Sequence, residues 1–493
     1  MNQASFLFHD YETFGADPKL DRPAQFAAIR TNADFEPIDE PVSILMKPVL
    51  DCLPDPVSCL ITGLTPQRAE QEGLDEPAFF AEVHQQMITP RTCTLGFNSI
   101  RFDDEFTRHG FFRNFYEPYA REWQGGNSRF DLLDLTRMCY ALRPEGIEWP
   151  EHAPGKPSFK LEHLARANRL THSHAHEALS DVEATIGLCR LIRTHQPRLF
   201  DFLFELRDKR RAGALLDWAK RTPVLHSSSR IPAERGATTI VIPLAQHPVL
   251  PNGVIVFDLM SDPTDLLDLD IDDIRDRVFV DRNALPEDVS RIPLKVVHLN
   301  KAPALAPLSV LNGVNTHRIG LDPDRCARHA LRLQAAEVSL ASKVRDVFAP
   351  LADYPKQDAE AALYDGFLAQ ADQALLPKIR RAAPEALQEL AQGLKDARLK
   401  ELVFRFRARH AAYTLSPAEA STWQRFLNTR LYDAPDRPER SLPARLTQIA
   451  AMRHNPELRP QDVPILDAVE QWLRALPNRL GLSAEPISTP ALD

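Results

Sequence analysis

Two carboxylates near the start of the chain have the residue types and the spacing of a metal site. Phe6–Phe8 is a short apolar run typical of a strand, and Asp10 and Glu12 follow it two residues apart. Residues i and i+2 of a strand point to the same face, so both carboxylates would project together. Such a pair is a poor stabiliser but a good ligand for Mg²⁺, which prefers oxygen donors. The pair therefore predicts a site for a hard cation.

Two later segments could complete this site. Thr92–Phe97 is predicted as a strand, and Asp103 follows it where the start of a helix would aim a carboxylate back across the sheet. His176 and Asp181 lie five residues apart, with the histidine in a loop and the aspartate on the first turns of a helix predicted over Glu177–Arg193. A mobile histidine beside a fixed carboxylate ligand suits a general base.

Neighbouring residues offer competing assignments. Three histidines alternate before the last of these helices: His172, His174 and His176. They would suit zinc, but no cysteine lies nearby, and we expect the first two to be solvent-exposed loop residues. Asp104 and Glu105 directly follow Asp103, but a helix turns them away by about 100° and 200°. Asp103 is therefore the predicted ligand.

The length and pattern of the chain predict several domains. At 493 residues, a prior of roughly 100–200 residues per domain suggests about three. The first part, to about residue 195, has an α/β pattern, with further strands at Phe26–Thr31 and Val42–Lys47 and helices over Phe130–Leu142 and Leu161–Asn168. After Pro197 the pattern becomes β-rich, with runs at Thr238–Ile242, Gly253–Leu259, Val278–Val280 and Leu294–Leu299. From about Cys326 it is helical.

The composition bears on the partners and the cellular location of the protein. The chain has 44% hydrophobic and 26% charged residues and a net charge of -9, which neither indicates nor excludes nucleic-acid binding. The sequence contains no apolar stretch of about 18 residues, so no membrane span is predicted. None of the cysteines forms a CxxC pair, which favours free thiols in a reducing cytosol and so a cytoplasmic location. The six are Cys52, Cys59, Cys93, Cys139, Cys189 and Cys326.

Taken in order, the three segments resemble the DEDDh exonuclease pattern of D-x-E, N-x3-F-D and H-x4-D. Longer matches extend the resemblance to the bacterial exodeoxyribonuclease I family. They are HDYETFG at 9–15, LDRPAQFAAIR at 20–30, LITG at 60–63, FDDE at 102–105, YALRPEG at 140–146 and PSFKLEHL at 157–164. These matches cover most of the first 200 residues, and the later parts of the chain resemble the family more loosely in the same order.

The resemblance implies an architecture. It predicts a ribonuclease-H-like exonuclease domain with a mixed sheet over residues 5–196, an SH3-like β-rich domain over 197–350 and a C-terminal helical domain over 351–482. Residues 483–493 are expected to form a flexible tail. In the family these domains form a C-shaped molecule that encircles single-stranded DNA, so a monomer is expected.

The resemblance also implies a reaction. The family releases 5′-mononucleotides stepwise from the 3′ end of single-stranded DNA, in DNA repair and recombination. Asp10, Glu12 and Asp181 would hold two Mg²⁺ ions, for which Mn²⁺ is a possible substitute, and Asp103 would complete the set. His176 would take the proton from the attacking water. Glu12 is also expected to contact the substrate.

Further residues match positions that contact DNA or a partner in the family. The DNA contacts would be Arg108, Tyr119, Trp123, Arg137 and Lys160; the family more often has Arg at the last of these. Aromatic faces stack on bases and Arg pairs with phosphates, although ordinary packing would also explain the two aromatics. Arg143 resembles a residue that binds the acidic C-terminal tail of single-stranded-DNA-binding protein; a surface Arg without a partner is the alternative.

Other interpretations stay open. The chain could act on RNA or short oligonucleotides, although such exonucleases are usually single domains of about 200 residues. It could also be a non-catalytic DNA-binding scaffold, but then loss of one of the acids would be expected. Arg405, Arg407 and Arg409 alternate with aromatics, either as a nucleic-acid strip or as the solvated or salt-bridged side of a helix with its aromatics in the core. The basic run Arg207–Arg211 is equally ambiguous.

Overall fold

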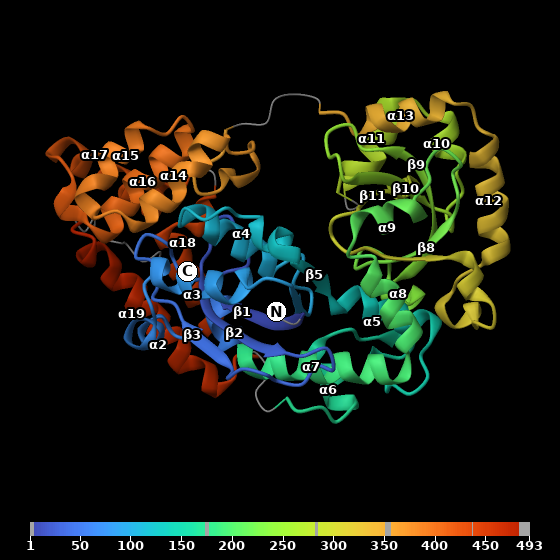
Figure 1. The fold of residues 1–493 in the computed structure, drawn as a ribbon, viewed down its shortest axis with the longest axis horizontal. Helices are drawn as coiled ribbons and strands as arrows, with labels where there is room; N and C mark the ends of the chain where they lie inside the picture. The colour runs from blue at the N-terminus through green and yellow to red at the C-terminus, as the bar shows by residue number, and fades with distance from the viewer. Residues whose placement is uncertain (1–3, 173–176, 282–283, 351–355, 436, 483–493) are drawn as a thin grey trace.

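A five-stranded mixed sheet forms the first part of the computed structural model (Figure 1). Its order is β3-β2-β1-β4-β5, with bounds β1 Ser5–Thr13, β2 Pro23–Thr31, β3 Val42–Leu45, β4 Thr92–Gly96 and β5 Ser128–Asp131. β1 is antiparallel to β2 and parallel to β4, and its pairing with β4 ends at Phe8 and Leu95. The last residues of β1 therefore extend beyond β4. The structure describes residues 4–172, 177–281, 284–350, 356–435 and 437–482.

Helices cover both faces of this sheet because the β1 side chains alternate. Leu7 and Tyr11 face a core built with α3 (Glu76–Ile88) and α4 (Asp103–Arg113). Phe8 faces a second core with α5 (Leu132–Leu142) and α7 (Ala178–His195). Asp10 and Glu12 share the parity of Phe8, which puts them on the α7 side. The remaining elements of this part are α1 Pro56–Thr62, α2 Pro66–Glu72, α6 Leu161–Ala167 and the short pair β6 Glu151–Ala153 and β7 Lys156–Pro157.

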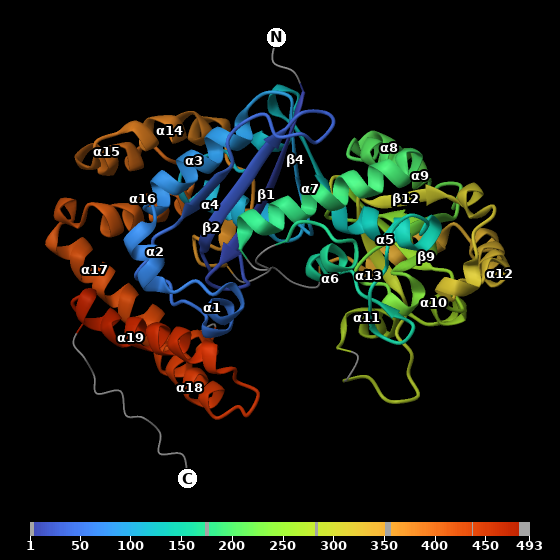
Figure 2. The ribbon, with the colours of Figure 1, turned by 90° about the horizontal axis from the view of Figure 1, so that it is seen from below.

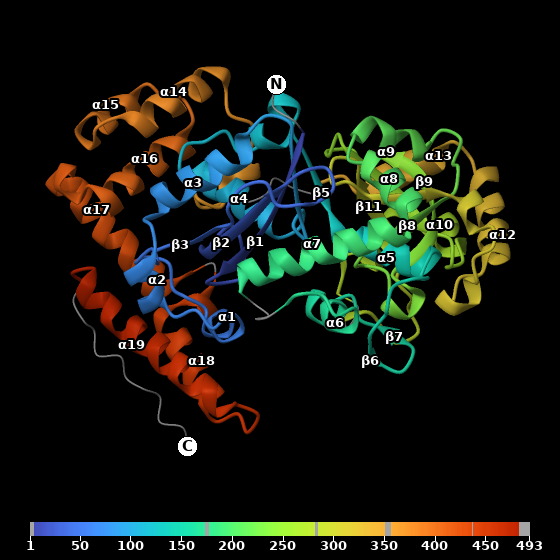
Figure 3. The same ribbon diagram turned by 60° about the horizontal axis from the view of Figure 1, so that its bottom comes forward.

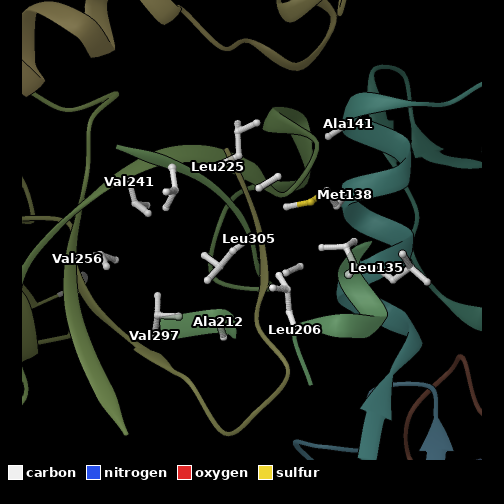
Figure 4. Close-up of a cluster of buried hydrophobic side chains, with 14 of the residues drawn as sticks. Leu135, Met138, Ala141, Leu206, Ala212, Leu225, Val241, Val256, Val297 and Leu305 are labelled. Atoms are coloured by element: carbon white, nitrogen blue, oxygen red, sulfur yellow. The ribbon is translucent and has the colours of Figure 1, made fainter. Parts of the chain in front are cut away.

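The second part of the chain is a β-rich domain that shares its core with the first. Its sheet has the order β11-β10-β9-β8-β12. In Figure 4, Leu135 and Met138 of α5 point toward Leu225 and Leu305 of this sheet, within one continuous apolar cluster. The bounds are α8 Pro197–Glu205, α9 Lys209–Leu215, β8 Val224–Ser227, β9 Thr238–Gln246, β10 Gly253–Asp258, α10 Thr264–Asp268, α11 Ile271–Phe279, β11 Leu294–His298, β12 Ala304–Pro307, α12 Pro323–Ala335 and α13 Ser339–Val347.

The third part is a helical domain, which lies on the opposite side of the first sheet from the β-rich domain (Figures 2 and 3). Leu442 and Trp472 pack with Phe14 and Cys59 of the α/β domain, and a separate cluster joins Leu376 to neighbouring apolar residues. The bounds are α14 Gln370–Arg381, α15 Leu387–Gln392, α16 Ala397–His410, α17 Pro417–Asn428, α18 Leu442–Arg453 and α19 Val463–Arg479. The helical and β-rich domains thus flank the α/β domain.

Buried ion pairs fasten the helical domain to the α/β domain. We call the following set the interdomain ion cluster: Arg22, Asp51, Glu76, Glu360, Arg409 and Arg430. Glu360 is fully buried, with one carboxylate oxygen 2.8 Å from Arg22 and the other 2.5 Å from Arg409. Surrounding arginines hold the pKa of Glu360 well below its usual range despite burial. The carboxylate is therefore ionised and paired across the domain boundary.

Several elements differ from the sequence-based prediction. The helix predicted over Phe130–Leu142 begins only at Leu132, because Phe130 and Asp131 end strand β5 and Asp131 caps the helix. The predicted run Val278–Val280 is not a strand; it covers the end of α11. Strands β8 and β12 were not predicted. In α16 the arginines are salt-bridged as one alternative proposed, but Arg405 and Arg407 are more buried than the phenylalanines beside them.

The interdomain ion cluster predicts a large effect of one substitution. We expect Glu360→Gln to lower the free energy of unfolding by about 3 kcal/mol at neutral pH, because it leaves buried arginines without their counter-charge. The measurement is urea unfolding followed by circular dichroism. Since the Glu360 pKa is lowered in the folded state, its stabilising effect is present above the unfolded pKa of about 4.3 and is lost as the pH falls below it.

The control is Glu72→Gln, which removes an exposed pair with Arg68 at 3.3 Å. Exposed pairs contribute little, so a change within about 0.5 kcal/mol is expected. Equal effects of the two substitutions, or an effect of Glu360→Gln that does not shrink in acid, would contradict the cluster's role.

Candidate active site

The carboxylates predicted on β1 lie at the open end of the parallel strands. β1 continues past its last pairing with β4, so Asp10 and Glu12 are not covered by that neighbour. Asp10 is half-buried and Glu12 is buried. In α/β sheets the space beyond the carboxyl ends of strands is the usual position for a ligand. The sheet therefore holds both groups at an end that remains accessible.

Two helix starts bring the other predicted carboxylates to this end. Asp181 lies in the first turn of α7, and one of its carboxylate oxygens lies within 4.8 Å of one oxygen each from Asp10 and Glu12. Asp103 is the first residue of α4, and its Oδ1 accepts a hydrogen bond of 2.9 Å from the backbone N–H of Tyr11. Asp103 thus stands beside the same strand without belonging to the group of three.

Ionisation of the clustered carboxylates is energetically unfavourable. Burial, followed by the charges of Asp103, Glu12 and Asp181, raises the pKa of Asp10 well above its usual range. Burial and the charge of Asp181 raise the pKa of Glu12 to about 8. Divalent cations would relieve this repulsion, and a set of carboxylate oxygens is the donor chemistry that Mg²⁺ prefers. The residues present therefore fit a hard divalent metal.

The predicted base, His176, lies outside the described residues. Its neighbour His172 corrects one expectation: it is not a solvent-exposed loop residue. The His172 side chain is 8% exposed, and its Nε2 lies 2.5 Å from Oδ1 of Asp181. Within the described part of the chain, the histidine nearest the carboxylates is thus one that the sequence analysis had set aside.

Comparison with known proteins identifies the family. Exodeoxyribonuclease I of Escherichia coli (strain K12) is 46% identical over 422 residues, which cover 85% of this chain and 88% of that protein. The chain belongs to the exodeoxyribonuclease I family. Family models match it in three places: Exonuclease over residues 7–189, Exonuclease I SH3-like domain over 207–350 and Exonuclease I C-terminal domain over 357–476. The predicted fold class is confirmed, and the chain is an exonuclease.

Solved structures of exonuclease I agree over nearly the whole length. Exonuclease I from Methylocaldum szegediense is 46% identical with a TM-score of 0.89, covering 96% of this chain and 99% of that one. The zinc-bound complex of Escherichia coli exonuclease I with single-stranded DNA is 42% identical with a TM-score of 0.91, covering 96% and 100%. In the described part of the present chain, none of the helices has the length and apolar character that a membrane span requires.

Two of the DNA contacts expected from the exodeoxyribonuclease I family have guanidinium groups that are already engaged. Arg108 is buried and forms two hydrogen bonds of 2.7 and 2.9 Å with Glu122. Arg137 pairs with Asp134 at 2.6 Å. These contacts orient both side chains; neither is a freely extended cation. Lys160, in contrast, is exposed at the start of α6, and its Nζ lies 3.7 Å from Glu162.

The two predicted aromatics flank one short helical turn, Ala120–Glu122. Tyr119 is half-buried with the Arg108 guanidinium over its ring at 5.3 Å. Trp123 is 66% exposed and lines a cavity of about 580 Å³. Arg207 and Lys209 of the ambiguous basic run line the same cavity.

Arg143, the predicted partner contact, is half-buried at the end of α5. Its guanidinium donates to the carbonyl oxygens of Leu142 at 2.6 Å and Val310 at 3.2 Å. The second of these bonds places it where the α/β domain meets the β-rich domain.

The structure adds aromatic residues that the sequence analysis missed. Phe367 is 91% exposed, and its ring lies 6.4 Å from that of Tyr119. The Tyr364 hydroxyl hydrogen-bonds Glu105 and accepts from Arg108 at 3.1 Å. Both aromatics come from the helical domain, about 245 residues further along the chain than Tyr119, so no local pattern could have joined them.

The carboxylate cluster predicts opposite effects of one substitution with and without metal. Because the Asp10 pKa is raised in the folded state, ionised Asp10 costs stability at neutral pH. We expect Asp10→Asn to unfold at an equal or higher temperature than the wild type in EDTA. Mg²⁺ should then raise the unfolding temperature of the wild type much more than that of the variant.

Differential scanning fluorimetry with and without Mg²⁺ measures both effects. Asp34→Asn, which changes an exposed carboxylate outside the cluster, serves as the control and should respond to Mg²⁺ as the wild type does. The same Mg²⁺-induced rise in Asp10→Asn and wild type would show that Asp10 is not a ligand.

Proposed function

We propose that this chain is a single-stranded-DNA exonuclease that works from the 3′ end and releases 5′-mononucleotides by two-metal hydrolysis. The observation that carries the proposal is the cluster of Asp10, Glu12 and Asp181 at one end of the sheet, with Asp103 beside it. The complex of its Escherichia coli relative with single-stranded DNA supports the choice of substrate.

In this proposal each acid has a role. Asp10, Glu12 and Asp181 would hold two Mg²⁺ ions, with Asp103 completing the set; Mn²⁺ would fit the same oxygen donors. Bound divalent ions supply charge that activates water and stabilises the leaving oxygen. His176 would accept the proton of the attacking water, a role for which the reference pKa of histidine, about 6.5, is suitable. Glu12 would also contact the substrate.

The DNA path in this proposal runs over Arg108, Tyr119 and Phe367, which contact one another in that order, and past the exposed Trp123. The paired arginines Arg108 and Arg137 would present oriented donors to phosphates, while the aromatic faces stack on bases. Lys160, on the exposed start of α6, would reach the strand near the carboxylates. The arrangement of two flanking domains around one sheet supports a strand held between them by a single chain, and so a monomer.

Further parts of the proposal concern setting and partners. Arg143 would bind the C-terminal carboxylate of the tail of single-stranded-DNA-binding protein, because a guanidinium matches a carboxylate. The six cysteines are free thiols, which suits the cytoplasm. We assign the chain to DNA repair and recombination with its family.

Two alternative functions are less well supported. Action on RNA or short oligonucleotides would leave the two flanking domains without a role. A non-catalytic DNA-binding scaffold would not need four carboxylates gathered at an energetic cost. Digestion of single-stranded DNA and RNA side by side distinguishes these alternatives from the proposal.

The central test follows the products of one single strand labelled at either end. With Mg²⁺, a 3′ label should appear at once as a mononucleotide, while a 5′ label should remain on a strand that shortens gradually. EDTA should stop the reaction. Asp10→Ala and His176→Ala should each lower the rate by at least about 10³-fold while the unfolding temperature is kept. Immediate release of the 5′ label would refute the polarity, and near-normal release by either variant would refute the assigned site.

The aromatic surface predicts a separable effect on binding. Phe367→Ala should weaken the binding of an oligonucleotide in EDTA by roughly five- to a hundredfold, because stacking contributes about 1–3 kcal/mol per base. Fluorescence anisotropy measures this change. Tyr413→Ala, which removes an exposed aromatic elsewhere in the same domain, is the control and should bind as the wild type does. Equal binding by all three proteins would remove Phe367 from the path.

A further inference from the structure

The turn between β4 and α4 delivers Asp103 to the carboxylate cluster, and it is tightly folded. Asn98 has a φ of 65°, in the left-handed region. A side chain at Gly96 would place its Cβ 2.6 Å from the Cβ of Ser99 and 2.9 Å from the carbonyl oxygen of His9. The Asp104 N–H donates to the carbonyl of Ser99 at 2.8 Å. The turn therefore lies directly against β1, and its shape determines where α4 begins.

One buried carboxylate from the next strand holds this turn. Asp131 ends β5 and pairs in register with Gly96. Its Oδ1 accepts from the N–H of Asn98 at 3.0 Å, and its Oδ2 accepts from the N–H of Ile100 at 3.0 Å. The same Oδ1 accepts from the N–H of Leu133 at 2.9 Å and so caps α5. Two of the three bonds therefore go to the turn.

A cap alone does not explain an aspartate at this position. Burial, with the nearby charge of Asp134, raises the pKa of Asp131 to about 6, so keeping it ionised costs free energy. A serine would cap a helix about as well without a buried charge. Only a side chain with two acceptor oxygens reaches both N–H groups of the turn and the helix start together.

We infer that Asp131 is a positioning residue for the nuclease reaction: its carboxylate fixes the 98–100 turn and thereby sets Asp103 beside the metal ligands on β1. This inference rests on the proposed function, because it gives Asp103 a place in the metal site. Asp131 itself bonds to backbone N–H groups of the turn and of α5, and acts through Asp103.

A second tether of the turn is weaker. Arg101 pairs with Asp134 of α5 at 2.6 Å, but its side chain is 38% exposed. Partly exposed ion pairs hold a backbone less firmly than buried charge-assisted bonds to backbone N–H groups. Loss of the Asp131 bonds would therefore leave the turn free to shift while Arg101 stays paired.

The test separates positioning from capping with Asp131→Ser. Serine keeps an acceptor for the Leu133 N–H but cannot also reach Asn98 and Ile100. We expect kcat on a labelled single strand to fall roughly 10- to 100-fold, since small displacements of a reacting constellation have effects of that size. The Mg²⁺ concentration for half-maximal rate should rise, while oligonucleotide binding in EDTA stays within about twofold of wild type.

Asp322→Ser is the matched control, because Asp322 caps α12 in the β-rich domain through Arg325 and lies outside the site. It should leave kcat and Mg²⁺ dependence unchanged. Asp131→Asn keeps the shape of the side chain but loses one acceptor. Its kcat and its Mg²⁺ concentration for half-maximal rate should lie between those of the wild type and Asp131→Ser.

Each other outcome overturns the inference. Asp131→Ser with wild-type kcat and Mg²⁺ dependence would show that the turn needs no anchor. A parallel loss of DNA binding, or the absence of a cooperative unfolding transition in both Asp131 variants, would show that the carboxylate serves the fold as a whole. Absence of mononucleotide release by the wild type in the same assay would instead refute the proposed function.

Discussion

The repulsion between carboxylates at the end of β1 is the constraint on which the rest of the first domain depends. Asp10, Glu12, Asp103 and Asp181 come from three separate segments. After burial, the charges of Asp103, Glu12 and Asp181 raise the pKa of Asp10, and the charge of Asp181 raises the pKa of Glu12. A chain free to relax would move these groups apart. Strand pairing, two helix starts and a hydrogen-bonded turn prevent that relaxation. The site therefore keeps a negative charge that bound cations would offset.

Adjacent residues show how closely charge is controlled. Asp103 and Asp104 follow one another, yet burial raises the pKa of Asp103, whereas Arg121 and Arg129 lower the pKa of Asp104. Asp104 is compensated by buried arginines, with Arg129 at 2.7 Å, and serves the structure. Within the described part of the chain no arginine pairs with Asp103, whose Oδ1 accepts a hydrogen bond from the N–H of Tyr11. The interdomain ion cluster resembles Asp104 in this respect, because each of its buried carboxylates pairs with arginine.

The sequence predicted the fold class, and it paired Asp10 with Glu12 because their spacing is local; Asp103 and Asp181 joined them through the ordered resemblance to the DEDDh pattern. Residues i and i+2 of a strand share a face, and a helix start follows a strand end; both rules act within a few residues. The sequence could not predict β5, since Phe130 and Asp131 precede a strongly helical segment without a break. Nor could it place His172 on Asp181 or Phe367 beside Tyr119, since those contacts depend on how distant segments pack. The domain boundaries and the roles of the site residues stay predictions.

The shared apolar cluster in Figure 4 bears on how this architecture could have been assembled. Helix α5 packs on α7 and also in a core that includes the second sheet, so part of its apolar face is covered by the β-rich domain. A nuclease gene could not exchange its β-rich partner by recombination at Pro197 without exposing Leu135 and Met138 to water. Family models divide the chain into separate segments, but any substitute for the second segment would have to reproduce the surface that covers this part of α5.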